Sequence, residues 1–177
     1  MDDRPDHISP SGDSLELSEE RLARLVRLCA RGFNRALQIR LSQHGVTFGQ
    51  WIFLRILWMK DGLSQRELSR HAGVTEPTTH SALQRLEAQG LVTRRNLPGN
   101  NRRQHAFLTE EGRRLRDKLE PLAVEANEVA VEGLTEAERA VLRRALLTII
   151  DNLDRDEAAA AERGVRMPPT RMPSVDV

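Results

Sequence analysis

The feature that most constrains this chain is a pair of short helix patterns separated by only a few residues. The first begins at Ser64, which forms a capping box with Glu67 three residues later. This pattern ends at Gly73, and Thr75 is placed to cap a second helix that closes at Gly90. Two short helices joined by such a tight turn are typical of a helix-turn-helix.

A β-hairpin pattern follows the second helix directly. Residues 91–95 are predicted to form a strand, residues 96–101 are rich in turn formers, and residues 104–108 form the return strand. A hairpin in this position is typical of the wing of a winged helix-turn-helix.

Amphipathic helices are predicted on both sides of this unit. Ser18 is placed to cap a helix over residues 18–42, and Thr109 and Thr135 are placed to cap the helices that follow the hairpin. The helix that begins after Thr47 is apolar on nearly all its faces, which predicts burial on every side with Arg55 as an interior charge. The fold class expected is therefore mainly α, with a small β-hairpin wing and flanking helices.

The charge of the chain is unevenly distributed. The net charge is only +1, yet seven acidic residues and one arginine occupy positions 1–20. Positions 64–105 hold seven arginines and three glutamates, a local charge of +4. A basic helix-turn-helix segment in a nearly neutral chain indicates a local nucleic-acid contact, because phosphate neutralisation needs cations only where DNA lies.

Several other classes of protein are not indicated. A single cysteine, Cys29, allows no disulfide within the chain and no cysteine-rich zinc site. No apolar run is long enough to span a membrane, and the acidic N-terminus has no signal-peptide core. No catalytic motif or metal-ligand spacing appears, so we expect a cytoplasmic protein that is not an enzyme and has no cofactor.

The order of these elements resembles that of the MarR family of transcriptional regulators over residues 18–153. The resemblance is carried by Leu63–Leu68 (LSQREL), Gly73–Thr75 (GVT), Leu83–Val92 (LQRLEAQGLV) and Leu108–Gly112 (LTEEG). It implies a homodimer in which N- and C-terminal helices intertwine, with one winged domain on each side. One departure concerns the wing tip, where Asn100 stands at a position that is usually acidic in the family, while Arg102 keeps the basic position.

The resemblance and the sequence pattern together divide the chain into five segments. We expect a disordered acidic arm over residues 1–17, helical dimerisation regions over 18–46 and 110–160, a winged DNA-binding domain over 47–109, and a flexible tail over 161–177.

Double-stranded DNA is the expected partner, bound at a pseudo-palindromic operator. The second helix would enter the major groove with its polar side chains, and the wing arginines would enter the minor groove. The predicted DNA-contacting residues are Ser64, Gln65, Thr75, Thr78, Thr79, His80, Ser81, Gln84, Arg85, Arg94, Asn100, Asn101, Arg102 and Arg103. Strand alternation sends Arg94 and its neighbour to opposite faces, so at most one of the two contacts DNA.

Many relatives bind anionic aromatic compounds, and a small-molecule effector is therefore a further expected partner. The predicted effector-binding residues are Arg40, His44, Trp51 and Arg55. A buried Arg55 would need a partner, which could be an effector carboxylate, an acidic side chain or water. Trp51 and Trp58 share a helix face, which core packing explains equally well.

The function we expect is that of a sequence-specific DNA-binding regulator, a homodimeric repressor released from its operator by a small molecule. Alternatives to this function remain open. Peroxide-sensing relatives use a cysteine in the first helix supported by tyrosines, but this chain has no tyrosine, and the apolar stripe around Cys29 favours an inert structural thiol. A chromosome-architecture protein or a protein-interaction module could also use a winged helix without a defined operator.

Overall fold

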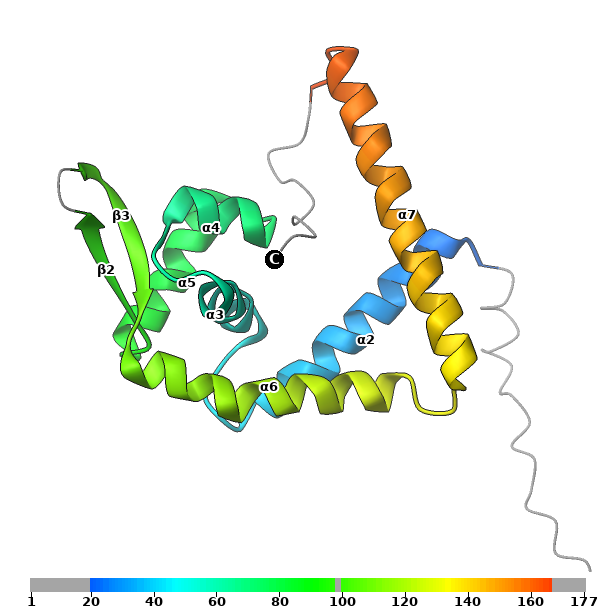
Figure 1. The fold of residues 1–177 in the computed structure, drawn as a ribbon, viewed down its shortest axis with the longest axis horizontal. Coiled ribbons are helices and arrows are strands. Elements are labelled where there is room, and N and C mark those ends of the chain that lie inside the picture. The colour runs from blue at the N-terminus through cyan, green and yellow to red at the C-terminus, as the bar shows by residue number, and fades with distance from the viewer. Residues whose placement is uncertain (1–19, 98–99, 167–177) are drawn as a thin grey trace, which may run out of the picture.

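The computed structural model describes residues 20–97 and 100–166, with only the backbone described at residues 100–102. It confirms a mainly helical chain with one small antiparallel sheet. The elements are α2 (Leu22–Ser42), α3 (Phe48–Met59), β1 (Leu63–Ser64), α4 (Gln65–Ala72), α5 (Glu76–Ala88), β2 (Val92–Leu97), β3 (Asn100–Leu108), α6 (Glu110–Ala130) and α7 (Glu136–Glu162). Figure 1 shows α3, α4 and α5 beside the β2–β3 hairpin, with α6 running from the hairpin towards α7, which stands away from this body.

The helix-turn-helix consists of α4 and α5, and its predicted ends are confirmed. Ser64 and Glu67 form the capping box, in which the Ser64 backbone N–H donates to the Glu67 carboxylate at 2.8 Å. The Ser64 hydroxyl also donates to this carboxylate and lowers the pKa of Glu67. Gly73 ends α4 with a φ of +64°, a left-handed conformation that glycine adopts without steric cost. Thr75 caps α5 by accepting the Thr78 backbone N–H.

The sheet has three strands in the order β1-β3-β2, one more than the sequence predicts. β1 was missed because it has only two residues, Leu63 and Ser64, which pair with Ala106 and His105 of β3. The wing strands are also longer than predicted, since β2 reaches Leu97 and β3 begins at Asn100. The sheet therefore joins the start of α4 directly to the wing.

A core of leucine side chains lies between the helices and the sheet. Its fully buried members come from α2, α3, α4, α5 and α6, and the largest are Leu41, Leu54, Leu57, Leu68, Leu83, Leu86 and Leu119. Two tryptophans of α3 add an edge-to-face contact, since the rings of Trp51 and Trp58 lie 5.4 Å apart at 72°. This contact is consistent with the core packing that their shared helix face indicates, although Trp51 also lines a pocket.

Two helix predictions are wrong in part. α2 begins at Leu22 with Arg21 as its N-cap residue and no side-chain cap, whereas Ser18 lies outside the described residues. α3 is not buried on every side, because Arg55 is exposed and Met59 is 57% exposed. This side of α3 faces an open pocket, so Arg55 is not an interior charge and needs no partner to offset burial.

The outer helices leave apolar side chains uncovered in the single chain. No residue of α7 is buried, and Val141, Leu142 and Leu147 are 54%, 43% and 51% exposed. Cys29 of α2 is exposed in the single chain, and the expectation of an inert thiol stays a prediction. α7 continues to Glu162 and so enters the segment predicted as a tail.

Candidate nucleic-acid interface

The polar face of α5 lies open to solvent on the helix-turn-helix. Thr78, His80, Ser81, Gln84 and Arg85 are all exposed, as their predicted role in reading DNA requires. The Thr75 and Thr78 hydroxyl oxygens lie 2.9 Å apart, and the Ser81 hydroxyl donates to the Pro77 carbonyl at 3.1 Å. Local hydrogen bonds within α5 and its cap therefore hold the side chains of Thr78 and Ser81.

Two predicted DNA contacts are corrected by burial. Thr79 is 0% exposed, and its hydroxyl donates to the Thr75 carbonyl at 3.1 Å. Ser64 is 6% exposed and its hydroxyl is engaged in the capping box. Neither side chain can reach a phosphate or a base. The sequence did contain a signal for Thr79, because the residue lies four positions before the buried Leu83 on the same helix face.

Gln65 joins the N-terminal ends of α4 and α5. Its side-chain amide donates to the Glu76 carbonyl at 3.4 Å, and its Oε1 lies 3.3 Å from Nδ1 of His80. Gln65 is only partly exposed. Through these contacts Gln65 can position α5, and this arrangement is also compatible with the predicted phosphate contact.

The wing is tied to α5 by an ion pair. The Arg94 guanidinium donates to Oε2 of Glu87 from Nε at 2.9 Å and from Nη2 at 2.6 Å, and the Arg94 backbone N–H donates to Oε1 at 3.0 Å. These bonds lower the pKa of Glu87. Because the Arg94 side chain is only 14% exposed, its predicted role as a DNA contact is corrected to a link between the wing and α5.

Arg95 is the arginine of this pair that reaches solvent. Its guanidinium carbon lies 4.2 Å from the centre of the Phe107 ring, a cation–π geometry. Alternation along β2 predicted one arginine on each face, but not that α5 covers the face of Arg94. Arg95 is therefore a candidate DNA contact that the sequence-based set omitted.

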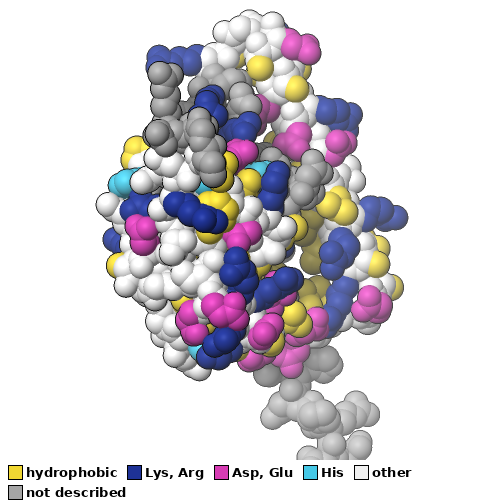
Figure 2. All heavy atoms as spheres, turned by 60° about the vertical axis from the view of Figure 1, so that its left-hand side comes forward, with side chains coloured by type: hydrophobic (Ala, Val, Ile, Leu, Met, Phe, Trp, Pro, Cys, Tyr) yellow, Lys and Arg dark blue, Asp and Glu magenta, His cyan; other side chains and the backbone are white. Residues whose placement is uncertain are grey.

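At the wing tip, Arg103 is exposed, as its predicted contact with DNA requires. The side chains of Asn100, Asn101 and Arg102 lie outside the described residues, so their roles stay predictions. Figure 2 shows arginine and lysine side chains spread over the visible face among polar and acidic ones, instead of gathered in one continuous patch.

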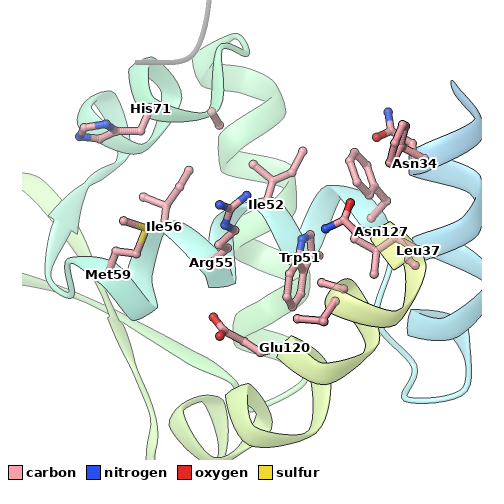
Figure 3. A pocket seen from close by; sticks show the side chains of 16 residues that line it. Asn34, Leu37, Trp51, Ile52, Arg55, Ile56, Met59, His71, Glu120 and Asn127 are labelled. Atoms are coloured by element: carbon pink, nitrogen blue, oxygen red, sulfur yellow. The ribbon is translucent and has the colours of Figure 1, made fainter. Parts of the chain in front are cut away.

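A pocket of about 520 Å³ opens between α2, α3, α4 and α6. It contains the predicted residues Trp51 and Arg55, and also Asn34, Glu120 and Asn127, which the sequence did not single out. Figure 3 shows the Arg55 guanidinium between Ile52 and Ile56, with Glu120 on the opposite side of the pocket. Glu120 pairs with Arg116 at 3.4 Å, whereas Arg55 has no ion pair within the described part of the chain.

His71 brings the first helix of the helix-turn-helix to this pocket. It belongs to α4 and lines the cavity, and its buried Nδ1 has no hydrogen-bond partner among the described residues. No local sequence pattern indicates this placement, because the pocket is lined by helices that are far apart in the sequence.

The other two predicted effector residues lie elsewhere. Arg40 donates to the Ala36 carbonyl at 3.0 Å and to the Glu125 carboxylate at 2.9 Å, so its charge is already paired. His44 is exposed in the turn after α2 and does not line the pocket. Both predictions are corrected, since neither side chain belongs to the cavity that holds Trp51 and Arg55.

Within residues 20–97 and 100–166 no helix combines the length and hydropathy needed to cross a membrane. The same residues hold no cluster of three histidine, cysteine or acidic side chains that could bind a metal ion.

Comparison with known proteins agrees with this architecture. Residues 44–104 match the model of the MarR family. The chain is 31% identical to the transcriptional regulator TtmR of Methylorubrum extorquens over 156 residues, which cover 88% of this chain and 76% of TtmR. The helix-turn-helix arrangement, the wing and these similarities define a winged-helix transcriptional regulator.

Solved structures give the same result. A MarR regulator from Listeria monocytogenes in complex with a 26mer DNA has a TM-score of 0.70 at 25% identity, covering 84% of this chain and 99% of that protein. Rv2887 of Mycobacterium tuberculosis, described as a transcriptional repressor, has a TM-score of 0.62 at 28% identity in its DNA complex, covering 74% of this chain and 98% of Rv2887. A second structure of Rv2887 contains salicylic acid. The chain belongs to the MarR family.

Proposed function

We propose that this protein is a sequence-specific repressor of transcription that acts in the cytoplasm as a homodimer and leaves its operator when a small aromatic acid binds. The observation that carries the DNA-binding part is the exposed polar face of α5 beside a wing fixed to the same helix through Glu87 and Arg94. Because this ion pair couples the two elements, the major-groove and minor-groove contacts would act as one unit.

DNA binding is tested by titrating labelled genomic fragments with the protein at 50 and 200 mM salt. Binding should be sequence-selective and should weaken steeply with salt, because phosphate contacts release counterions. Arg103→Ala should reduce the magnitude of the salt slope by about one. The matched control is Arg114→Ala, at an exposed arginine of α6 that is 68% accessible and should leave the slope unchanged. Salt-sensitive binding without sequence preference would favour the architectural alternative.

The homodimer is supported by the apolar side chains that the single chain leaves open. Leu22 near the start of α2 is 60% exposed, and Leu146 and Leu153 of α7 are 40% and 52% exposed. An amphipathic helix of 27 residues with no buried side chain gains little from its own chain, so a second copy is the expected cover. Sedimentation equilibrium should find a dimer at micromolar concentration, and a monomer throughout would contradict this part of the proposal.

The effector part rests on Arg55. Its guanidinium lies in a pocket that also contains Trp51 and Ile52, so it can pair with a carboxylate while an aromatic ring packs against apolar side chains. Rv2887 crystallises with salicylic acid, which has this chemistry. An effector that touches α2, α3, α4 and α6 at once can favour a domain spacing that the operator does not accept.

Salicylate is the probe for this pocket. It should weaken operator binding by the wild-type chain at millimolar concentration and have at least tenfold less effect on Arg55→Gln. Arg40→Gln serves as a matched control outside the pocket and should keep the response. A wild-type response that Arg55→Gln leaves unchanged would remove this residue from the effector site.

A further inference from the structure

α2 carries an unusual excess of positive charge. Arginines occupy positions 21, 24, 27, 31, 35 and 40, and no acidic residue lies between Arg21 and Ser42. The spacing of three and four residues places Arg24, Arg27, Arg31 and Arg35 along one side of the helix, and all four are exposed. We call these four residues the arginine stripe.

Most of the arginine stripe has no counter-charge in residues 20–97 and 100–166. Arg24 pairs with Glu20, whereas Arg27, Arg31 and Arg35 have no ion pair among the described residues. Like charges three and four residues apart on a helix repel one another, so the stripe destabilises an isolated α2. An anionic surface that lies against it would remove this cost.

The last three turns of α7 have the opposite charge. Residues 151–162 contain five acidic side chains and one arginine, a net charge of −4. Asp154 and Asp156 are exposed, and Glu157 is partly exposed. Arg155 neutralises only Asp151, at 2.8 Å. We call Asp154, Asp156 and Glu157 the acidic end of α7.

These two charged surfaces do not satisfy each other within one chain. No ion pair joins α2 to α7 in the described part of the molecule. Each surface adjoins uncovered apolar side chains of the same helix, Leu28 at 41% exposure on α2 and Leu153 at 52% on α7. Both helices therefore present an apolar surface flanked by charge, the pattern in which charged pairs set the partner and register of associating helices.

We infer that, in the homodimer proposed above, the arginine stripe of each copy lies against the acidic end of α7 of the other copy. This inference rests on the proposed dimer and adds its register and its partner selectivity. In a two-fold symmetric dimer the contact occurs twice, so one pair of complementary surfaces on the chain provides two favourable contacts. Exposed pairs contribute little affinity one by one, but a mismatched partner would place like charges together. The stripe thus favours a second copy of this chain over a related protein with different helix charges.

Charge reversal tests the contact without knowledge of the operator. The first variant replaces Arg27, Arg31 and Arg35 by Glu, and the second replaces Asp154, Asp156 and Glu157 by Arg. Each variant alone should form its homodimer at least tenfold more weakly than wild type in 50 mM salt, with a smaller difference in 500 mM salt. A mixture of the two should form the heterodimer preferentially, because both of its contacts again join opposite charges. Native mass spectrometry distinguishes the three dimers by mass.

The matched control reverses three exposed arginines elsewhere, Arg66, Arg70 and Arg103, and changes the net charge by the same amount as the first variant. It should dimerise like wild type. The inference is overturned if the two reversed variants dimerise like wild type or show no preference for each other. It is also overturned if reversal of the stripe lowers only DNA affinity, which would assign the stripe to phosphates. A wild-type chain that stays monomeric would instead contradict the homodimer itself, and preferential heterodimer formation proves that both variants fold.

Discussion

Gly112 stands where the first turn of α6 passes the chain that leaves α5. A Cβ atom at this position would lie 2.1 Å from the Leu91 carbonyl oxygen and 3.3 Å from Cδ2 of Leu108. The same carbonyl oxygen accepts the Thr109 backbone N–H at 3.1 Å, so it is not free to move. The glycine of the LTEEG motif is therefore required by a backbone contact at the root of the wing.

Gly112→Ala should accordingly destabilise the fold by about 1–3 kcal/mol, the usual range for forcing extra atoms into packed surroundings. The matched control is Gly49→Ala in α3, where a Cβ atom would meet nothing within 4 Å. That variant should be neutral or gain up to about 1 kcal/mol from helix propensity. Urea unfolding at one protein concentration measures both, and equal stabilities of the two variants would contradict the close contact.

Glu87 gives a prediction about pH. Its pKa is lowered chiefly by the hydrogen bonds from the Arg94 side chain. A lowered carboxyl pKa stabilises the folded state fully at pH values above that of an unfolded glutamate, about 4.3, and the contribution is lost as the pH falls through the lower folded value. Arg94→Gln should therefore return the pKa of Glu87 towards its ordinary value and should cost more stability at pH 7 than at pH 3.

Carboxyl NMR titration of both proteins measures this pKa directly, and stability curves at the two pH values give the linked effect. Arg95→Gln, at the neighbouring exposed arginine, is the control and should leave the titration of Glu87 unchanged. A Glu87 pKa that is the same with and without Arg94 would show that the ion pair does not form in solution.

For single residues, the sequence predicted which positions of a helix are exposed better than it predicted the contacts that each side chain makes. Thr78, Ser81 and Gln84 are exposed on α5 because a helical period fixes which positions share a face. Arg94 was misassigned because the choice between the two faces of β2 depends on where Glu87 of α5 lies, which no local pattern contains. His71 was missed for the same reason, since the pocket beside it is formed by helices far apart in sequence.

At the scale of elements, two glutamines connect the end of α5 to the start of α3. Gln50 is 4% exposed, and its side-chain amide donates to Oε1 of Gln89 at 2.7 Å. Gln89 in turn donates to the Gly45 carbonyl at 3.0 Å in the turn that follows α2. These hydrogen bonds hold α5 against α3 and the end of α2, and both of these helices line the pocket.

A double-mutant cycle should detect this link. Gln89→Leu leaves the buried Gln50 amide without its partner, which should cost about 1–3 kcal/mol, and Gln50→Leu should behave similarly. The double variant should be less destabilised than the sum of the two, because the unsatisfied partner is gone. Urea unfolding of the four proteins measures the coupling, and strictly additive effects would mean that the glutamines act independently.

The elements themselves were largely predictable where capping and periodicity agree. Thr47, Ser64 and Thr135 all form the capping boxes or caps that their spacing indicates. The failures occur where one signal is weak. β1 has two residues and exists only because β3 pairs with it, and the start of α2 has no capping side chain at Arg21.

At the scale of the whole molecule, one winged domain cannot specify a long operator, because its single reading helix enters one stretch of major groove. In the proposed homodimer, α2 and α7, which leave apolar side chains uncovered, would hold two such domains together. Sequence patterns identify the helices but not the spacing of the two α5 helices, since this distance is fixed between chains. The spacing of the two operator half-sites can be used to measure this distance.

The two half-sites should lie about one helical turn apart, roughly 10 base pairs from centre to centre. Insertion of five base pairs between them turns one half-site to the opposite side of the duplex and should lower affinity at least a hundredfold, towards non-specific binding. Insertion of ten base pairs restores the facing of the half-sites but separates them by about another 34 Å. Because α2, α6 and α7 would join the two domains through helices and not through a loose linker, the dimer cannot follow, and affinity should stay low.

Equal binding to all three spacings would indicate winged domains that bind independently, and recovery at ten base pairs would indicate a flexible connection between them. Anisotropy titrations of the three duplexes at one salt concentration therefore measure how rigidly the helices of the dimer fix the distance between its two α5 helices.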